Sequence, residues 1–256
     1  PFQKMIVRHR IENTIRLYAK QKHLEHMVTE QILEKEKNNV VMVDILSHIV
    51  EFRNGESGLH VLHIRTITEI LLKQLQKTCK QYHLTPARIA LITNASSLHD
   101  IGKISIPEEI LNKPGKLTPE EFELIKTHSL IGAEMLEGLT YYQNEELVQV
   151  ARDICRWHHE RYDGSGYPDG LSGEQIPIAA QVVSLADVYD ALTSERVYKK
   201  AYSHEQALNM IFNGECGAFN PVLLDALKVV DSHLENEVKV RSAGKITRDN
   251  IHALAY

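Results

Sequence analysis

Apolar residues recur along most of the chain at intervals of three and four, which is the spacing of one face of a helix. The alternation of apolar and polar residues that marks half-buried strands is nearly absent. Helix start signals precede several apolar runs: Thr85 stands before Pro86, Thr118 before Pro119, and Pro177 opens another run. We therefore predict an all-α fold with helices near 59–80, 86–99, 118–131, 145–159, 177–190, 203–213 and 221–234.

The first predicted helix, over residues 5–50, contains neither Pro nor Gly and is rich in Glu, Lys, Gln, Leu and Ile. Its apolar positions follow one another at three, four or six residues, as in Ile11, Ile15, Tyr18, Leu24, Val28 and Ile32. The heptad is imperfect, so two interpretations stay open: a short parallel coiled coil, or a solvated helix packed on its own domain. A helix of this length that is rich in charged residues is hard to stabilise without packing against another element. We therefore favour a connector that dimerises.

Composition narrows the class of protein. The 256 residues are 43% hydrophobic and 25% charged, which suits one large packed domain plus a connecting segment. The net charge of -5 argues against a broad nucleic-acid surface. Three distant cysteines without a CxxC pair indicate neither a zinc ribbon nor a disulfide framework. No apolar run reaches the length of about 18 residues that spans a bilayer, and no signal peptide is recognisable, so we expect a cytoplasmic protein.

Histidine is the one anomaly, because 14 of them include several beside Asp or beside each other. Imidazole and carboxylate groups together suit Fe, Mn or Zn. Taken singly, each signal has a plainer interpretation: a core histidine for His128, which we expect on an inner face with Phe122 and Ile125, or a solvated pair for Glu56 and His60. Their joint occurrence on five helical segments favours a metal centre. The candidate ligands are Glu56, His60, His99, Asp100, His128, His158, His159 and Asp187.

Several segments together resemble a known family. They are Gly55–His60, Leu98–Pro107, Thr127–Gly132, the run His-His-Glu-x-x-Asp-Gly-x-Gly-Tyr-Pro over 158–168, and Ala186–Lys199. The chain from about Val43 to Leu234 resembles the HD-GYP domain, the branch of the HD superfamily that hydrolyses cyclic di-GMP. The His-Asp pair alone is unspecific, whereas the run over 158–168 at its distance from that pair is highly specific.

The resemblance implies an HD-superfamily helical bundle over 46–236, preceded by a connector helix over 1–45 and followed by a tail over 237–256. It implies two or three transition-metal ions, Fe or Mn, with Asp100 bridging and Glu56 serving a third ion. It further implies that Lys103 contacts the phosphate or the bridging oxygen, that Arg196 and Lys199 hold a phosphate, and that Asp190 supports the site or binds substrate. His63 stands where Arg is frequent, and we expect it to be a packing or hydrogen-bonding residue.

The implied activity is metal-dependent hydrolysis of cyclic di-GMP to linear pGpG, with slower cleavage to GMP. Three alternatives stay open: a catalytically silent cyclic-dinucleotide sensor or adaptor, a nucleotidase acting on mononucleotides, and a phosphodiesterase of a related dinucleotide such as cyclic GMP-AMP. The motifs do not encode the base contacts that would separate the two cyclic dinucleotides.

Two segments bear on partners. Residues 163–170 form the densest loop signal, and we expect its glycines to make a tight turn and Tyr167 to make a contact, with a GGDEF-type cyclase as a candidate partner. Pro1-Phe2 and the run Ile6–Asn13 resemble the end of a response-regulator receiver domain entering its output connector. The chain is then expected to be the output half of a two-component regulator and a homodimer through its first helix.

Overall fold

The computed structural model describes residues 3–54, 59–194 and 200–242, and these contain helices and turns but no strand. The predicted all-α class is confirmed. The elements are α1 (Lys4–Arg53), α2 (Leu59–Thr78), α3 (Pro86–Ser96), the 3-10 helix η1 (Ile101–Ser105), α4 (Glu108–Leu111), α5 (Pro119–Glu137), η2 (Thr140–Tyr142), α6 (Glu146–Trp157), η3 (Gly173–Gln175), α7 (Ile178–Thr193), α8 (His204–Phe212) and α9 (Pro221–Ser242). No described helix is long and apolar enough to cross a membrane.

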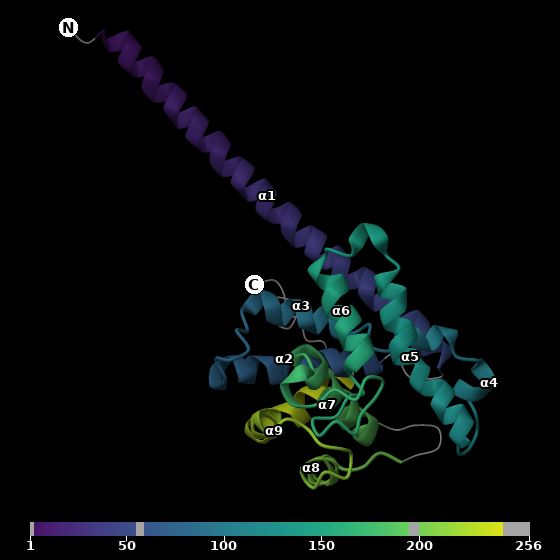
Figure 1. Cartoon of the computed structure of the whole chain (residues 1–256). Helices are drawn as coiled ribbons and strands as arrows, with labels where there is room; N and C mark the ends of the chain where they lie inside the picture. Colours follow the sequence, from purple (N-terminus) through teal and green to yellow (C-terminus); the bar gives the residue numbers. More distant parts are fainter. Residues whose placement is uncertain (1–2, 55–58, 195–199, 243–256) are drawn as a thin grey trace.

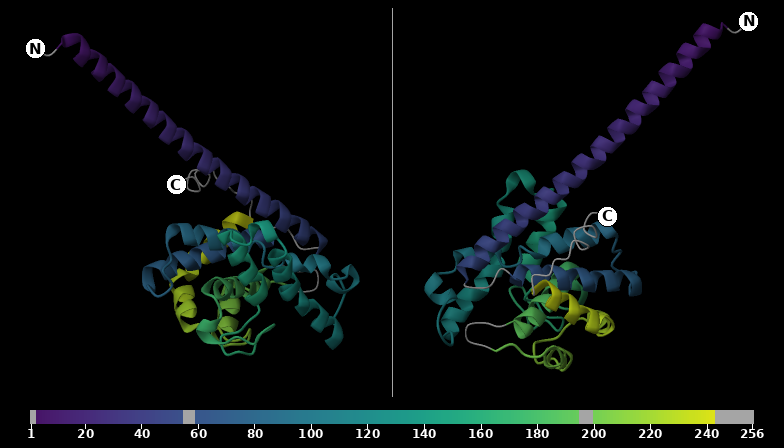
Figure 2. Two further views of the ribbon diagram at one scale, coloured as in Figure 1. Left: turned by 45° about the horizontal axis from the view of Figure 1, so that its top comes forward. Right: turned by 180° about the vertical axis from the view of Figure 1, so that it is seen from behind.

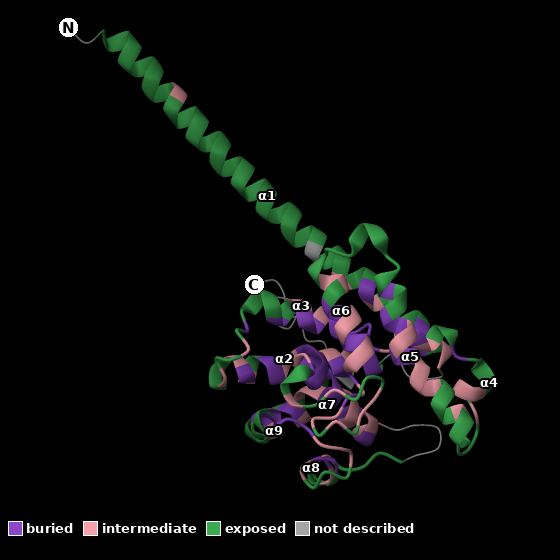
Figure 3. Ribbon diagram, viewed as in Figure 1, coloured by how far each residue is buried: buried purple, intermediate pink, exposed green. Residues whose placement is uncertain are grey.

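Helix α1 is a straight rod that projects far beyond the remaining helices (Figures 1 and 2). Most of its length is exposed, and only its C-terminal end lies against the domain, where Val43, Ser47 and Val50 are buried (Figure 3). The helix continues through the predicted connector boundary at residue 45 and ends at Arg53. The same helix therefore belongs to both the connector and the domain.

The core is organised around α2 and α7, which are surrounded by α3, α6, α8 and α9. Ile64, Ile67, Leu71 and Leu75 of α2 have no exposed surface and form the buried face of this helix. Helix α7 is apolar on nearly every side and is almost completely buried. Charged groups on α7 are therefore expected to be paired or to serve a site.

The predicted start signals cap real helices. Thr118 accepts from the backbone N–H of Glu121, whose side chain accepts from the Thr118 N–H, and Pro119 occupies the first turn. One expectation about this helix is wrong, because Phe122 is exposed instead of lying on the inner face with His128. The first half of α5 extends past the domain, and its buried residues begin at His128 (Figure 3).

Gly102 allows η1 to lie directly on α5. A Cβ at this position would stand 2.0 Å from the carbonyl oxygen of His128 and 2.6 Å from the backbone nitrogen of Gly132. Both obstacles are backbone atoms, so neither can rotate away. The glycine thus fixes the distance between the segment that carries Asp100 and the helix that carries His128.

We predict that Gly102→Ala destabilises the fold by about 1–3 kcal/mol, because the added methyl group overpacks a backbone contact. Chemical denaturation of both proteins measures the difference. Gly138→Ala is the matched control: its Cβ meets nothing closer than 3.4 Å at an ordinary helical φ of -65°, so its effect should stay within about 0.5 kcal/mol. Equal stability of Gly102→Ala and the native chain would contradict this account.

Candidate metal centre

Seven of the eight predicted ligands converge in the interior from separate elements. They form two groups whose candidate donor atoms lie within 4.8 Å of one another. One group is His60, His99 and Asp187, and the other is Asp100, His128, His158 and His159. The eighth candidate, Glu56, lies outside the described residues, as do Arg196 and Lys199.

The ligands sit mainly at helix ends and turns. His60 is the second residue of α2, His158 is the C-cap of α6, and His99 and Asp100 lie between α3 and η1. Adjacent residues inside a helix point about 100° apart, whereas a turn frees two neighbours to face one centre. Both adjacent pairs of ligands lie at such places: His99-Asp100 in the turn after α3, and His158-His159 at the end of α6.

The outer ring nitrogens of three histidines are held by backbone carbonyls. Nδ1 lies 2.9 Å from the Ser96 oxygen in His99, 2.7 Å from the Ile125 oxygen in His128, and 2.9 Å from the Ile154 oxygen in His158. A carbonyl can only accept, so Nδ1 carries the hydrogen and donates it. In the neutral ring, which is the form that binds a metal ion, the opposite nitrogen, Nε2, is then a lone pair that points inward.

In His60 the Nδ1 hydrogen is held by a carboxylate instead of a backbone carbonyl. Its Nδ1 donates to Asp190 Oδ2 at 2.6 Å, and His63 Nδ1 lies 2.6 Å from the other oxygen. Burial opposes the charge of Asp190, but hydrogen bonds from His60 and His63 outweigh burial and lower its pKa. Asp190 is 1% exposed and also accepts from Ser194 Oγ at 2.8 Å. This geometry makes Asp190 a support for His60, and His63 a hydrogen-bonding residue as expected.

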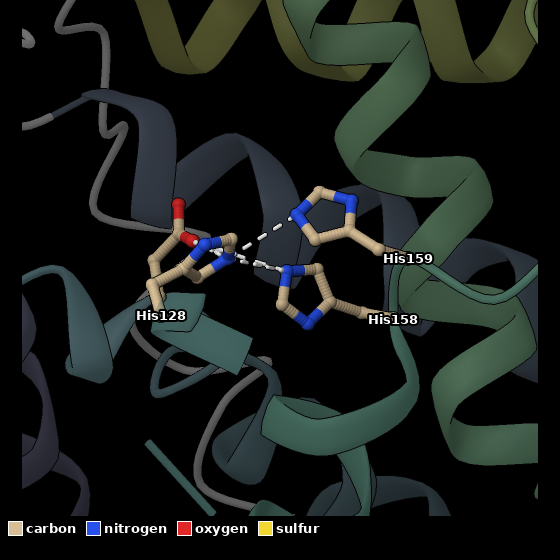
Figure 4. Close-up of side chains that lie close together, drawn as sticks. His128, His158 and His159 are labelled. Atoms are coloured by element: carbon tan, nitrogen blue, oxygen red, sulfur yellow. Dashed lines mark hydrogen bonds and ion pairs between the residues drawn. The ribbon is translucent and has the colours of Figure 1, made fainter. Parts of the chain in front are cut away.

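The inward nitrogens face one another at short distances. Nε2 of His60 lies 3.4 Å from Nε2 of His99, and Nε2 of His128 lies 3.4 Å from Nε2 of His158. Figure 4 shows His128, His158 and His159 with their rings turned toward a common point. Two lone pairs cannot hydrogen-bond to each other, and in a buried site their repulsion is weakly screened. A cation between them removes the conflict.

Asp100 connects the two groups. Its Oδ2 lies 3.3 Å from His99 Nε2 and 2.6 Å from Lys103 Nζ, while its Oδ1 lies 3.2 Å from His128 Nε2 and 3.8 Å from His158 Nε2. Oδ1 is buried and accepts no hydrogen bond. Burial would raise the pKa of Asp100, but Lys103 and His99 outweigh it and hold the pKa well below its usual range. Each oxygen of the ionised carboxylate thus faces one group.

Burial keeps two histidines of the second group, His158 and His159, uncharged. It lowers the pKa of His158 to about 3, and neighbouring imidazoles act in the same direction. Burial and the adjacent His158 also lower the pKa of His159 well below its usual value. Both rings are therefore neutral near pH 7, which is the form that binds a metal ion.

His159 is held differently from the other four histidines. Its Nε2 lies 3.2 Å from His128 Nε2, and its ring stacks on Tyr167 with 4.7 Å between centroids and 25° between planes. Lys126 Nζ stands 5.4 Å from the Tyr167 ring centroid. Tyr167 thus contacts one of the ligands of the site, while Asp163, Ser165 and Asp169 of its loop are exposed.

Sequence reasoning missed the half-buried Arg161. Its Nη1 donates to Ser184 Oγ at 2.7 Å, and its guanidinium stands 5.5 Å from the Phe219 ring centroid. Burial lowers the Arg161 pKa, while the charge of nearby Asp187 opposes that shift. The sequence feature that could have indicated Arg161 is its position two residues after His159. Neither periodicity nor spacing, however, shows that its guanidinium lies near Asp187.

The donor set fits divalent transition metals. It consists of five imidazoles and two carboxylates, whose inward atoms include facing lone pairs and a buried carboxylate oxygen without a hydrogen-bond donor. Imidazole and carboxylate groups bind Fe, Mn and Zn. Their outer atoms are hydrogen-bonded in the way that orients metal ligands in proteins. The residues present can therefore hold one ion in each group, with Asp100 between them.

Comparison with known proteins identifies relatives. The HD domain family model matches residues 41–216. The chain is 40% identical over 214 residues to a probable cyclic di-GMP phosphodiesterase of Vibrio cholerae, covering 82% of this chain and 48% of the relative. It is 38% identical over 204 residues to the cyclic di-GMP phosphodiesterase response regulator RpfG of Xanthomonas campestris, covering 80% and 51%.

Two further comparisons concern a relative named for another substrate and a solved structure. A 3'3'-cGAMP-specific phosphodiesterase 2 of Vibrio cholerae is 36% identical over 198 residues, covering 77% of this chain and 35% of the relative. The solved structure of Bd1817, an HDG"Y"P protein from Bdellovibrio bacteriovorus, matches with a TM-score of 0.51 at 21% identity, covering 78% of this chain and 67% of that one. That likeness concerns the fold.

The chain spans about half the length of the curated relatives that it matches first. Within the matched region lie every described ligand, the His-Asp pair and the Gly-Tyr-Pro loop. This chain therefore belongs to the HD domain family, in the HD-GYP branch that its motifs resemble.

Proposed function

We propose that the chain is a metal-dependent phosphodiesterase that hydrolyses cyclic di-GMP to linear pGpG, with slower cleavage to GMP. The observation that carries the proposal is the pair of buried ligand groups joined by Asp100. Several relatives at 34–47% identity are named cyclic di-GMP phosphodiesterases, which supports this substrate. A chain that keeps seven ligands together is poorly explained as a silent sensor.

Two divalent ions in such a site would lower the pKa of a water molecule and stabilise both the attacking and the leaving oxygen. The chain's own residues supply the rest. Lys103 holds its ammonium beside Asp100 and is partly exposed, so it can also reach a non-bridging phosphate oxygen. Tyr167 stacks on His159, and Lys126 stands over the Tyr167 ring, so the two side chains can limit how a nucleotide enters. Arg196 and Lys199 are proposed to hold a second phosphate.

We further propose Fe or Mn as the metal, because mixed imidazole and carboxylate ligands suit both. A third ion depends on Glu56, which precedes His60 by four residues. Cyclic GMP-AMP is the second candidate substrate, because one relative is named as specific for it. Comparing the two substrates therefore belongs to the first test.

The signalling context is also a proposal. The response-regulator relative and the N-terminal resemblance support a chain that follows a receiver domain and works in the cytoplasm. The exposed residues of the loop 163–170 are proposed to contact a GGDEF-type cyclase. In this proposal α1 connects the receiver domain to the metal centre.

A homodimer through α1 is supported by its outer face. Val43, Ser47 and Val50 already pack on the domain, yet the opposite side of the same turns is apolar and exposed. Two parallel copies of one helix bring identical positions opposite each other, so an uncharged apolar stripe is complementary to itself. The stripe follows a spacing of four, four and three residues and consists of Val41, Ile45, Ile49 and Phe52.

We predict that the chain, purified without oxygen, contains at least about two Fe or Mn ions and releases pGpG from cyclic di-GMP. The measurements are elemental analysis and chromatography of products from cyclic di-GMP and cyclic GMP-AMP. His99→Ala and Asp100→Ala should each lose metal and at least about 100-fold in turnover, because they remove ligands.

His204→Gln is the control for this test. It alters a partly buried histidine that bonds Tyr189 and Asp231 and belongs to neither ligand group, so metal content should persist. Full metal content and turnover in Asp100→Ala would overturn the proposed activity. Preferential cleavage of cyclic GMP-AMP would transfer the proposal to that substrate.

We predict that Asp190→Asn weakens metal binding about 10–100-fold, because the neutral amide no longer holds both His60 and His63. Metal titration of the apoprotein measures the change, and KM for cyclic di-GMP should change little. A rise in KM with unchanged metal affinity would instead assign Asp190 to substrate binding.

We predict that Ile45→Glu raises the dimer dissociation constant at least about 10-fold, because it places a charge in the apolar stripe. Analytical ultracentrifugation of the whole chain measures the dissociation constant. Lys37→Glu introduces the same side chain on an exposed polar position of α1 and should leave the constant nearly unchanged. An unaltered dimer in Ile45→Glu would exclude this face as the interface.

A further inference from the structure

The end of α1 bonds the backbone at three places near ligands: in α2 next to His60, before the His99-Asp100 pair, and after it. Over its last two turns, Ser47, Glu51 and Arg53 reach across to these segments. All three contacts involve the backbone of the segment, so they constrain its path and not merely one side chain. This concentration of contacts is unexpected for a helix that otherwise projects into solvent (Figure 1).

Ser47 supports the segment that leads to His99. Its hydroxyl lies 2.7 Å from the carbonyl oxygen of Ser97, in the turn that follows α3. The preceding carbonyl, that of Ser96, accepts from Nδ1 of His99 at 2.9 Å. One side chain of α1 therefore bonds the residue next to the carbonyl that orients this ligand.

Glu51 supports the helix that carries His60. It is 4% exposed, and its Oε1 accepts from the backbone N–H of Val61 at 2.8 Å. Val61 lies in the first turn of α2, where backbone N–H groups lack partners within the helix. A carboxylate there is also favoured by the helix dipole. Glu51 thus fixes the start of α2 one residue after His60.

Arg53 supports the segment that follows Asp100. Its Nη1 donates to the carbonyls of Lys103, at 3.3 Å, and Ile104, and its Nη2 donates to that of Ile106 at 2.8 Å. In return, Asn112 Nδ2 donates to the carbonyl of Arg53 at 3.0 Å. The guanidinium can satisfy several carbonyls at once because its donors form a rigid planar fork. Lys103 and Asp100 are therefore tied to the end of α1.

The space between α1 and the ligands is nearly filled. A cavity of about 10 Å³ is lined by Glu51, Asn54, His60, His99 and Asp100, among others. That volume holds about one water molecule at most. Close packing leaves little room for α1 to shift without moving the ligand-bearing backbone.

We propose that Ser47, Glu51 and Arg53 are positioning residues of the metal centre, through which the connector helix sets the geometry of His60, His99 and Asp100. A displacement or rotation of α1 is then transmitted directly to these ligands. The inference rests on the proposed metal-dependent function, but it concerns how the chain holds the metal and so can be measured without substrate.

The test compares Arg53→Ala, Arg53→Lys and Arg65→Ala in the whole chain loaded with Mn²⁺. Arg65 is the matched control: its guanidinium also links α1 to the domain, through the side chains of Asp44 and Asn94, and both of these described bonds go to side chains instead of ligand-bearing backbone. The first readout is the rate of metal release to a chelator. The others are kcat and KM for cyclic di-GMP and the dimer dissociation constant.

We expect Arg53→Ala to release metal about 10–100-fold faster than the native chain, because it loosens the support of the ligands. We also expect a lower kcat with KM little changed, an intermediate value for Arg53→Lys, and near-native release for Arg65→Ala. The dimer dissociation constant should be unchanged in all three variants, because neither Arg53 nor Arg65 belongs to the apolar stripe of α1.

Equal metal release from Arg53→Ala and Arg65→Ala would overturn the inference, since a general loosening of α1 would then explain both. If Arg53→Ala does not fold, Ser47→Ala provides the same comparison at the His99 segment. Faster metal release in a chain whose native form does not cleave cyclic di-GMP would support the inference and reject the proposed function. If the native chain cleaves cyclic di-GMP but Arg53→Ala releases metal at the native rate, the proposed function stands and the inference is rejected.

Discussion

The structure depends on buried imidazole nitrogens that face one another without a hydrogen between them. In His60, His99, His128 and His158, an oxygen acceptor fixes a proton on Nδ1, so Nε2 is a lone pair in the neutral, metal-binding form of each ring. Lone pairs 3.4 Å apart in a poorly screened interior repel one another. The arrangement costs free energy in the polypeptide alone and becomes favourable when a cation occupies each group. Metal binding and the stability of this part of the fold are therefore linked.

The rest of the fold serves this convergence. Helix ends and turns, instead of helix middles, carry most of the ligands, because only there can neighbours such as His99 and Asp100 share a centre. Gly102 brings their segment onto α5, and the end of α1 bonds the backbone beside three ligands. The buried apolar helix α7 contributes Asp187 and Asp190, one toward the ligands and one behind them. The centre is thus held from several independent directions.

Local signals in the sequence were sufficient for much of the fold. Thr118-Pro119 and Thr85-Pro86 marked true helix starts, and the spacing of Ile67, Leu71 and Leu75 marked a buried face. The histidine motifs and the family resemblance nominated ligands that the structure brings together. Features that depend on contacts between distant parts of the chain had no such local signal in the sequence. Neither the division of the ligands into two groups, nor the exposure of Phe122, nor the stacking of Tyr167 on His159 follows from spacing, because each depends on how distant elements pack.

The central claim is that each ligand group holds a metal ion and that Asp100 lies between them. The most direct measurement is a crystal structure of protein prepared without oxygen in the presence of Mn²⁺, with anomalous scattering used to locate the metal. The account predicts one peak among His60, His99 and Asp187 and another among Asp100, His128, His158 and His159. Density that shows these rings intact in position, with water and no anomalous peak between them, would contradict it.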